Sequence, residues 1–146
     1  MMLTAGNELL EQWAAGWSAH DPERVASLYA DDCVYEDVPL GAVTRGRREL
    51  AALGRPFPLC GLGARPQDAF PDFGIELTAG FVAGDRAAME WVMSGTHARG
   101  RPGVPATGRR FRVRGATMLE LRDGRVTRNR DYWDVATLLT QVGLMP

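Results

Sequence analysis

Residues 109–134 read RRFRVRGATMLELRDGRVTRNRDYWD, a pattern typical of two strands joined by a tight turn. Asp123-Gly124 lies at the centre, and Asp-Gly favours a two-residue type I′ turn because both positions tolerate a positive φ. Apolar and polar side chains alternate through 109–121 and 125–133, as expected for strands with one buried face. The stretch therefore predicts a long antiparallel hairpin within an antiparallel sheet.

The second strand of this hairpin has two chemically different faces, since side chains alternate along an extended chain. One face holds Thr127, Asn129, Asp131 and Trp133. The other holds Val126, Arg128, Arg130 and Tyr132. Long arginines reach water readily, so the second face is expected outside and Asp131 inside. Asp134 ends the strand before an apolar helical segment, a place for a helix N-cap. We interpret Asp131 as the candidate general acid or base and Asp134 as structural.

The remaining segments complete an α+β outline, with helices first and most strands after them. Apolar spacing and capping residues predict helices over 6–19, from Asp21-Pro22 onward, over 47–53 and over 135–142. Trp13 belongs to the apolar side of the first helix, and Tyr29 to that of the second. Further strands are expected over 33–38, 73–82 and 86–97, with a turn at Gly84-Asp85. Gly143 follows the last helix as its stop.

The segment 54–71 stands apart because it carries four prolines and three glycines. No regular structure is expected there. Long irregular loops in small domains are often lids or binding loops. Its apolar side chains favour a segment that covers something, and they are Phe57, Leu59, Leu62 and Phe70.

Length and composition exclude several function classes. The 146 residues fit one domain, 1–146, and the formal net charge of -1 gives no global field for nucleic acid or an anionic membrane. All 17 basic residues are arginines, which excludes lysine-dependent catalysis. No usual zinc spacing is formed by Cys33, Cys60, His20 and His97. Neither a signal peptide nor an apolar run of ~20 residues is found, so a cytoplasmic location is expected.

Alternation on the neighbouring strands predicts a mostly apolar inner wall. On 109–121 the inner side chains are Phe111, Val113, Gly115, Thr117, Leu119 and Leu121, with Arg110, Arg112 and Arg114 opposite. On 86–97 they are Met89, Trp91, Met93, Gly95 and His97. Asp131, Asn129 and His97 are the few polar groups in this wall, a composition typical of a small-molecule cavity. The alternative is an ordinary core with these groups near its rim.

The first strand adds Tyr35 and Asp37, which share a face with Cys33. If that face points inward, Asp37 joins Asp131, and repulsion between the two carboxylates favours protonation of one of them. A carboxylate tuned in this way exchanges protons near neutral pH. The alternative is a solvated edge strand with Tyr35 packed underneath.

The other candidate site residues each have a functional and a structural interpretation. Trp91 and Trp133 are suited to stack against a flat ligand or to fill the core. Asp72 is placed either at the pocket mouth or in a turn, bonded to nearby backbone amides. His97 has an ordinary pKa near 6.5, which suits acid–base work, but a lone histidine at a strand end is commonly only packed.

Several segments in order resemble the SnoaL-like polyketide cyclases, which belong to the NTF2-like cone-shaped α+β barrels. The resemblance covers nearly the whole chain, in residues 17–22, 28–33, 70–73, 95–97, 105–110, 123–126 and 132–143. It implies a homodimer of cones, each with a pocket between sheet and helices. It also implies an intramolecular aldol cyclisation in which a pocket Asp moves protons without metal or cofactor. Asp131 matches that Asp. A histidine accompanies it in the family, where Thr117 stands here, and His97 is a possible substitute.

A second resemblance is to the limonene-epoxide-hydrolase-like enzymes. Tyr35-Glu36-Asp37 is similar to their water-positioning Tyr and Asn, with Asp37 in place of Asn, and Asp131 matches their Asp strand. Their Arg and second Asp correspond to Trp91 and Met93. Two of the three residues of that catalytic set are therefore absent, and epoxide hydrolysis is the less favoured reaction.

These observations lead to two competing functions. The first is an enzyme that takes a hydrophobic carbonyl-bearing small molecule, with Asp131 as acid/base and with Tyr35 and Asp37 orienting ligand or water. Its expected pocket residues are Trp91, Met93, His97, Thr117, Asn129, Trp133 and Asp72. The second is a binding module with the same pocket and no turnover. Neither requires a cofactor, a metal, nucleic acid or a membrane.

Overall fold

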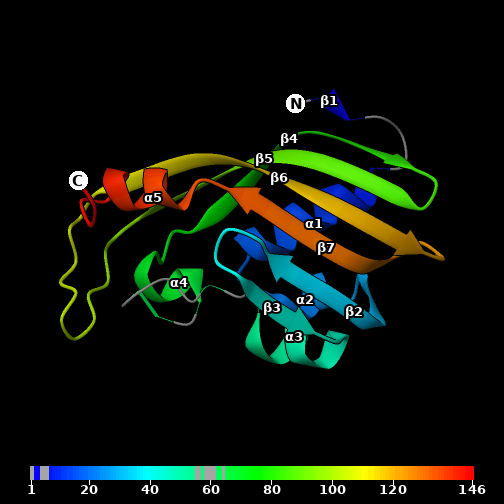
Figure 1. The fold of residues 1–146 in the computed structure, drawn as a ribbon, viewed down its shortest axis with the longest axis horizontal. Coiled ribbons are helices and arrows are strands. Elements are labelled where there is room, and N and C mark those ends of the chain that lie inside the picture. The colour runs from blue at the N-terminus through cyan, green and yellow to red at the C-terminus, as the bar shows by residue number, and fades with distance from the viewer. Residues whose placement is uncertain (1, 4–6, 55–56, 58–61, 64) are drawn as a thin grey trace.

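Seven strands form one sheet in the order β1-β4-β5-β6-β7-β2-β3 (Figure 1). This computed structural model describes residues 2–3, 7–54, 57, 62–63 and 65–146. The strands are β1 (Met2–Leu3), β2 (Tyr29–Asp37), β3 (Ala42–Arg45), β4 (Gly74–Ala83), β5 (Arg86–Thr96), β6 (Arg110–Arg122) and β7 (Arg125–Trp133). The four long strands from β4 to β7 are antiparallel neighbours, as the sequence predicts.

Five helices within the described residues accompany the sheet, and α1 lies across one of its faces (Figure 1). They are α1 (Glu8–Ser18), α2 (Pro22–Ala26), α3 (Arg47–Leu53), α4 (Pro66–Ala69) and α5 (Val135–Gln141). α1 is anchored on β4 at both ends, because Asn7 donates to the Gly80 carbonyl at 3.0 Å and the Ser18 hydroxyl bonds to the backbone of Ile75 at 2.9 Å. The apolar side of α1, which includes Leu10, is therefore pressed against the inner face of the sheet.

The β6–β7 hairpin forms as the sequence predicts. Asp123 and Gly124 have φ values of 52° and 77°, and two successive positive φ angles are what a type I′ turn requires. Along β6 the arginines at 110, 112 and 114 are exposed, while Phe111 and Val113 between them are buried. The inner and outer faces of this hairpin are thus confirmed.

One residue of the hairpin breaks the expected alternation. Val126 was expected on the arginine face, but its side chain is fully buried. The register of β6 against β7 shifts between Glu120 and Leu121, opposite this end of β7. A bulge of this kind lets two residues of one strand face a single partner, so alternation counted from Trp133 fails before it reaches Val126.

β2 is longer than expected and has a partner that the sequence did not predict. It begins at Tyr29, which was assigned to the preceding helix, and it runs parallel to β7. The helix that starts at Asp21-Pro22 ends at Ala26; its N-cap is correct, since Asp21 accepts a hydrogen bond from the Arg24 amide at 3.1 Å. The parallel pairing brings two chain segments about a hundred residues apart into neighbouring positions.

The segment 54–71 contains more structure than expected. Pro66–Ala69 forms the short helix α4. Pro66 takes the first helical position, where proline is tolerated. Phe57, Leu62 and Phe70 are buried, and Phe57 stacks on the Trp133 ring with centroids 6.1 Å apart. Residues 55–56, 58–61 and 64, including Leu59 and Cys60, lie outside the described residues, so the role of this segment as a lid stays a prediction.

α5 closes the chain with the caps that the sequence indicates. Asp134 accepts hydrogen bonds from the Thr137 amide at 3.1 Å and its hydroxyl at 2.7 Å, and these bonds lower the pKa of Asp134. Gly143 has a φ of 80°, and the Leu144 amide donates back to the Leu139 carbonyl, as in a Schellman stop. Asp134 is thus a structural cap, as interpreted. No helix in the described part of the chain is long and apolar enough to cross a bilayer.

Candidate active site

The Asp131 carboxylate lies on the inner face of the sheet and is fully buried. Three side chains donate hydrogen bonds to it. Its Oδ1 atom accepts from the Thr117 hydroxyl at 2.6 Å and from the Asn129 amide at 2.8 Å. Its Oδ2 atom accepts from the Tyr35 hydroxyl at 2.5 Å. These contacts stabilise the charged form of a carboxylate removed from water.

The sheet register explains why these side chains converge. Thr117 on β6 is the direct cross-strand partner of Asp131 on β7, and Tyr35 on β2 is that of Asn129. Neighbouring strands lie about 4.8 Å apart, so paired side chains on one face lie within hydrogen-bonding reach. The expected grouping of Tyr35, Thr117, Asn129 and Asp131 is therefore present in the structure.

Aromatic side chains in turn donate hydrogen bonds to Asn129 and Thr117. The Asn129 Oδ1 atom accepts from the Tyr29 hydroxyl at 2.6 Å and from the Trp13 indole at 3.2 Å. The Trp91 indole donates to Thr117 at 2.8 Å. Trp91 reaches Thr117 because it lies over Gly115, where an added Cβ would stand only 2.3 Å from the Trp91 ring.

Asp37 is the second buried carboxylate on this face. It is the register partner of Asp131 in the parallel β2–β7 pair, and it is fully buried. Its Oδ2 atom accepts from the Trp133 indole at 2.9 Å, and its Oδ1 atom accepts from the Leu40 amide at 3.1 Å. Asp37 therefore sits beside Asp131 and also holds the turn that follows β2. Because Asp37 is buried and β2 lies between β7 and β3, the solvated edge-strand alternative is wrong.

Asp72 and His97 are not brought to this cluster. Asp72 is exposed and accepts from the Thr96 amide at 2.7 Å and its hydroxyl at 2.8 Å, bonds that lower the pKa of Asp72 against the opposing effect of partial burial. His97 is buried beside Phe70, and its Nδ1 atom accepts from the Thr107 amide at 3.2 Å. Burial lowers the pKa of His97.

His97 is also distant from Asp131 along the sheet. The residue of β5 that pairs with Thr117 is Met89, eight positions before His97. At about 3.3 Å per residue this separation excludes a direct contact with the carboxylate. The expectation that His97 substitutes for the missing assistant histidine is therefore wrong, and Thr117 itself contacts Asp131.

The geometry agrees with a sequence-family match. The model of the SnoaL-like polyketide cyclases matches residues 7–142, which is nearly the whole chain. The chain belongs to the SnoaL-like polyketide cyclase family. No curated protein matches it.

Solved structures share the fold of this SnoaL-like chain. A Catenulispora acidiphila protein with a ketosteroid isomerase-like fold, solved in complex with trimethylamine, is 27% identical, covering 95% of this chain and 94% of its own at a TM-score of 0.77. IdmH from Streptomyces antibioticus, a proposed polyketide cyclase, is 24% identical, covering 96% and 99% at a TM-score of 0.74. An epoxide hydrolase of M. tuberculosis is 22% identical, covering 92% and 86% at a TM-score of 0.65. The α+β fold of the NTF2-like and ketosteroid isomerase-like proteins is confirmed.

The SnoaL-like chain differs from the epoxide-hydrolase pattern at the two β5 positions that the sequence indicated. Trp91 and Met93 are both fully buried on the inner face of β5, at the positions where the resemblance implies an Arg and an Asp. Trp91 and Met93 therefore place apolar side chains where the epoxide-hydrolase pattern has two charged ones. Trp133, the other expected wall residue, is buried and bonded to Asp37.

Trp13 and Tyr29 are site residues that sequence reasoning missed. Trp13 was identified only as part of the apolar side of α1, and Tyr29 only as part of a helix. Both contact Asn129, which lies at least 100 positions further along the chain. The only available signal was the indole N–H of Trp13 and the hydroxyl of Tyr29, since a buried Tyr or Trp usually needs a hydrogen-bond partner.

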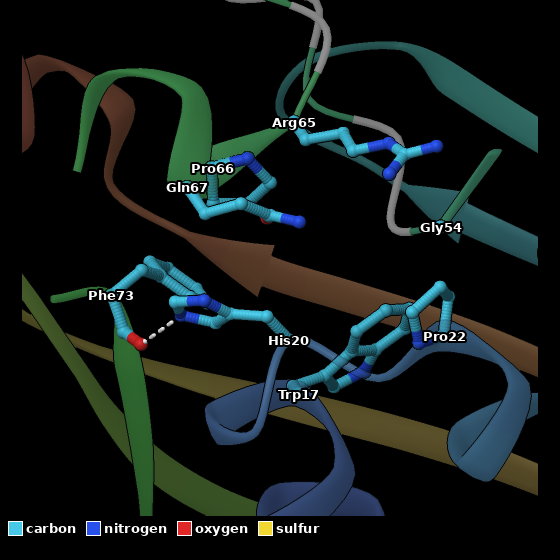
Figure 2. Close-up of a pocket in the computed structure, with 8 residues that line it drawn as sticks. All are labelled: Trp17, His20, Pro22, Gly54, Arg65, Pro66, Gln67 and Phe73. Atoms are coloured by element: carbon cyan, nitrogen blue, oxygen red, sulfur yellow. Dashed lines mark hydrogen bonds between the residues drawn. The ribbon is translucent and has the colours of Figure 1, made fainter. Parts of the chain in front are cut away.

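A separate small hollow lies between the α1–α2 turn and α4 (Figure 2). Its lining includes Trp17, His20, Arg65 and Phe73, and the His20 ring bonds to the Phe73 carbonyl at 2.8 Å. Trp17 borders this hollow and also packs edge-on against Tyr35 with ring centroids 5.9 Å apart. The larger pocket expected around Asp131 stays a prediction.

Proposed function

We propose that this SnoaL-like protein catalyses cofactor-free acid–base chemistry, an aldol-type cyclisation or an isomerisation, on a hydrophobic carbonyl-bearing small molecule. The observation that supports this most is the buried Asp131 carboxylate, which is held by three donors on a mostly apolar face. A carboxylate fixed in this way has its proton-accepting oxygens prepositioned, so little reorganisation is needed during a proton transfer.

The proposed reaction assigns one task to each residue. Asp131 removes a proton from a carbon beside a carbonyl, and the bonding electrons move onto that carbonyl oxygen to give an enolate. In a cyclisation the enolate carbon attacks a second carbonyl of the same molecule, and protonated Asp131 returns the proton to the resulting alkoxide. Tyr35 donates a hydrogen bond to the developing oxyanion. Asp37 orients the ligand or a water molecule.

The direct test is proton exchange at the acidic carbon, because enolate formation must exchange that proton with solvent even when no ring closes. A panel of aryl ketones with one to three rings, including 2-tetralone, is incubated with the protein in D2O. Proton NMR follows the loss of the signal beside the carbonyl. Exchange is expected to be faster than in buffer alone with the wild-type protein, and to return to the buffer rate with Asp131→Asn.

The second candidate is a non-catalytic small-molecule-binding module. The observation that favours it is that both inner carboxylates are already bonded to the protein's own donors, as in a structural network. Such a module would bind members of the panel, detected by saturation-transfer NMR, without accelerating exchange in any of them. Binding with no acceleration would therefore replace the enzyme proposal.

A further inference from the structure

Two hydrogen-bond chains end on the same oxygen of Asp131, and each begins at an indole N–H. In the first, the Trp13 N–H lies 2.9 Å from the Tyr29 hydroxyl and 3.2 Å from the Asn129 amide oxygen. Tyr29 donates to that amide oxygen at 2.6 Å, and the Asn129 nitrogen donates to Oδ1 at 2.8 Å. The second runs from Trp91 through Thr117 to Oδ1, with steps of 2.8 and 2.6 Å. An indole N–H only donates, so the direction of the first step in each chain is fixed.

The first chain determines how Asn129 faces Asp131. Trp13 only donates, and the Tyr29 hydroxyl that accepts from it is left to donate its own hydrogen to Asn129 at 2.6 Å. Both therefore present donors to the amide oxygen of Asn129. The amide nitrogen is then turned toward Asp131. That nitrogen carries two hydrogens and accepts nothing, so Asp131 Oδ1 must act as an acceptor toward it.

The second chain acts in the same direction. Trp91 donates into one lone pair of the Thr117 oxygen, and the single Thr117 hydrogen is left to point at Oδ1. Oδ1 therefore receives two donors and is a poor place for a proton. Oδ2 differs, because its partner, the Tyr35 hydroxyl, is able to donate to a carboxylate and also to accept from a carboxylic acid.

We propose that Trp13 and Trp91 are positioning residues that keep Oδ1 of Asp131 unprotonated and place the exchangeable proton on Oδ2, beside Tyr35. This inference rests on the proposed function, since it specifies which oxygen of the base meets the substrate. It predicts that substrate approaches Asp131 from the Tyr35 side. Trp13 and Trp91 act through Asn129 and Thr117 and contact no reacting atom.

The test follows the Asp131 carboxyl directly by 13C NMR in protein labelled at aspartate, with the signal assigned by its loss in Asp131→Asn. Trp13→Phe and Trp91→Phe each remove one indole donor and keep an aromatic ring. With a donor chain weakened, Oδ1 loses part of its hydrogen bonding, so the Asp131 carboxyl signal measured at a fixed pH of about 7 is expected to move away from its wild-type position. Trp17→Phe is the matched control, because the buried Trp17 N–H has no hydrogen-bond partner in the described part of the chain. It is expected to leave the Asp131 signal at its wild-type position.

A smaller substitution in the same chain tests the inference if Trp13→Phe does not fold. Tyr29→Phe removes one hydroxyl donor to Asn129 and leaves the ring in place, so the Asp131 signal is expected to move in the same direction. Asp131 signals in Tyr29→Phe and Trp91→Phe that match the signal in Trp17→Phe overturn the inference. This readout needs no substrate, so it fails separately from the proposed function: a displaced Asp131 signal together with full exchange activity in Asp131→Asn would remove the enzyme and leave the positioning chains standing.

Discussion

At the scale of single residues, Gly115 decides how Trp91 lies. A Cβ at position 115 would stand 2.3 Å from the benzo end of the Trp91 ring, a contact that no side chain tolerates. The ring has nowhere to move, because Trp91 is fully buried and stands against Trp13 with centroids 6.2 Å apart. The absence of a side chain at 115 is therefore part of what builds the Asp131 site.

Gly115→Ala is expected to destabilise the protein by about 1–3 kcal/mol, as overpacking of a buried site generally does. Urea unfolding followed by circular dichroism measures this change. Gly74→Ala is the control in the same sheet, since a Cβ there meets nothing closer than the Ser18 hydroxyl at 3.7 Å. Equal stability of the two variants would show that Trp91 is not locked in place.

The sequence predicts the inner position of Asp131 because arginines indicate the solvent-facing side of β7. Side chains alternate between the two faces of a strand, so Asp131 lies on the opposite, inner side. Thr117 and Asn129 follow from the same rule. The bonds from Trp13 and Tyr29 do not, because they join α1 and β2 to β7, and no spacing within one element encodes a contact between elements. His97 was wrongly expected near Asp131, because alternation predicts which face of the sheet a side chain lies on and does not predict how far along the strand it lies.

At the scale of elements, the connection between β5 and β6 depends on the protonation of His97. Burial lowers the pKa of His97, and its Nδ1 atom accepts from the Thr107 amide, which needs the neutral ring. A base with a lowered folded pKa contributes stability that is fully present above the unfolded value of about 6.5. That stability is lost as the pH falls from there through the folded pKa.

We expect amides of residues 98–109 to lose hydrogen-exchange protection between pH 7.5 and 5.5, after correction for the intrinsic pH dependence of exchange. Mass spectrometry of peptides from this connection measures it. His97→Gln, which does not titrate, is expected to show no such loss. A loss of the same size in His97→Gln would assign the effect to another group.

The order of strands could be predicted only in part. The turns at Gly84-Asp85 and Asp123-Gly124 identify two antiparallel pairs, β4 with β5 and β6 with β7. The parallel pairing of β2 with β7 has no local signal, because it joins segments about a hundred residues apart. β3 and α4 were missed because each has only four residues, too few to establish a period. The site depends on the β2–β7 pairing, since this pairing alone places Asp37 and Tyr35 next to Asp131.

At the scale of the whole molecule, the outer face of the sheet carries an exposed apolar patch. Three of its side chains are largely exposed: Phe81 at 54%, Met118 at 46% and Tyr132 at 44%. Strand register makes the patch continuous, because Phe81 and Met118 both pair with Ala88, and Tyr132 pairs with Ala116. We expect contiguous exposed apolar surface of this kind to serve as an interaction site.

We expect this outer patch to form the contact of a homodimer, the assembly that the family resemblance implies. Met118→Glu would bury a charge at that contact and is expected to weaken dimerisation at least about tenfold. Light scattering during size-exclusion chromatography measures the mass across a dilution series. Leu53→Glu, which replaces an exposed apolar residue on α3, is the control. A monomeric wild type, or a dimer unaffected by Met118→Glu, would contradict the expectation.

The central claim is that Asp131, and not the nearby Asp134, transfers the proton. Its most direct test compares solvent exchange of a bound aryl ketone by Asp131→Asn and Asp134→Asn at equal protein concentration and pH. Removal of a general base costs about 100-fold or more, so Asp131→Asn is expected to lose at least that factor. Asp134→Asn keeps a capping side chain and is expected to exchange as wild type. Equal rates in the two variants, with both folded, would contradict the account.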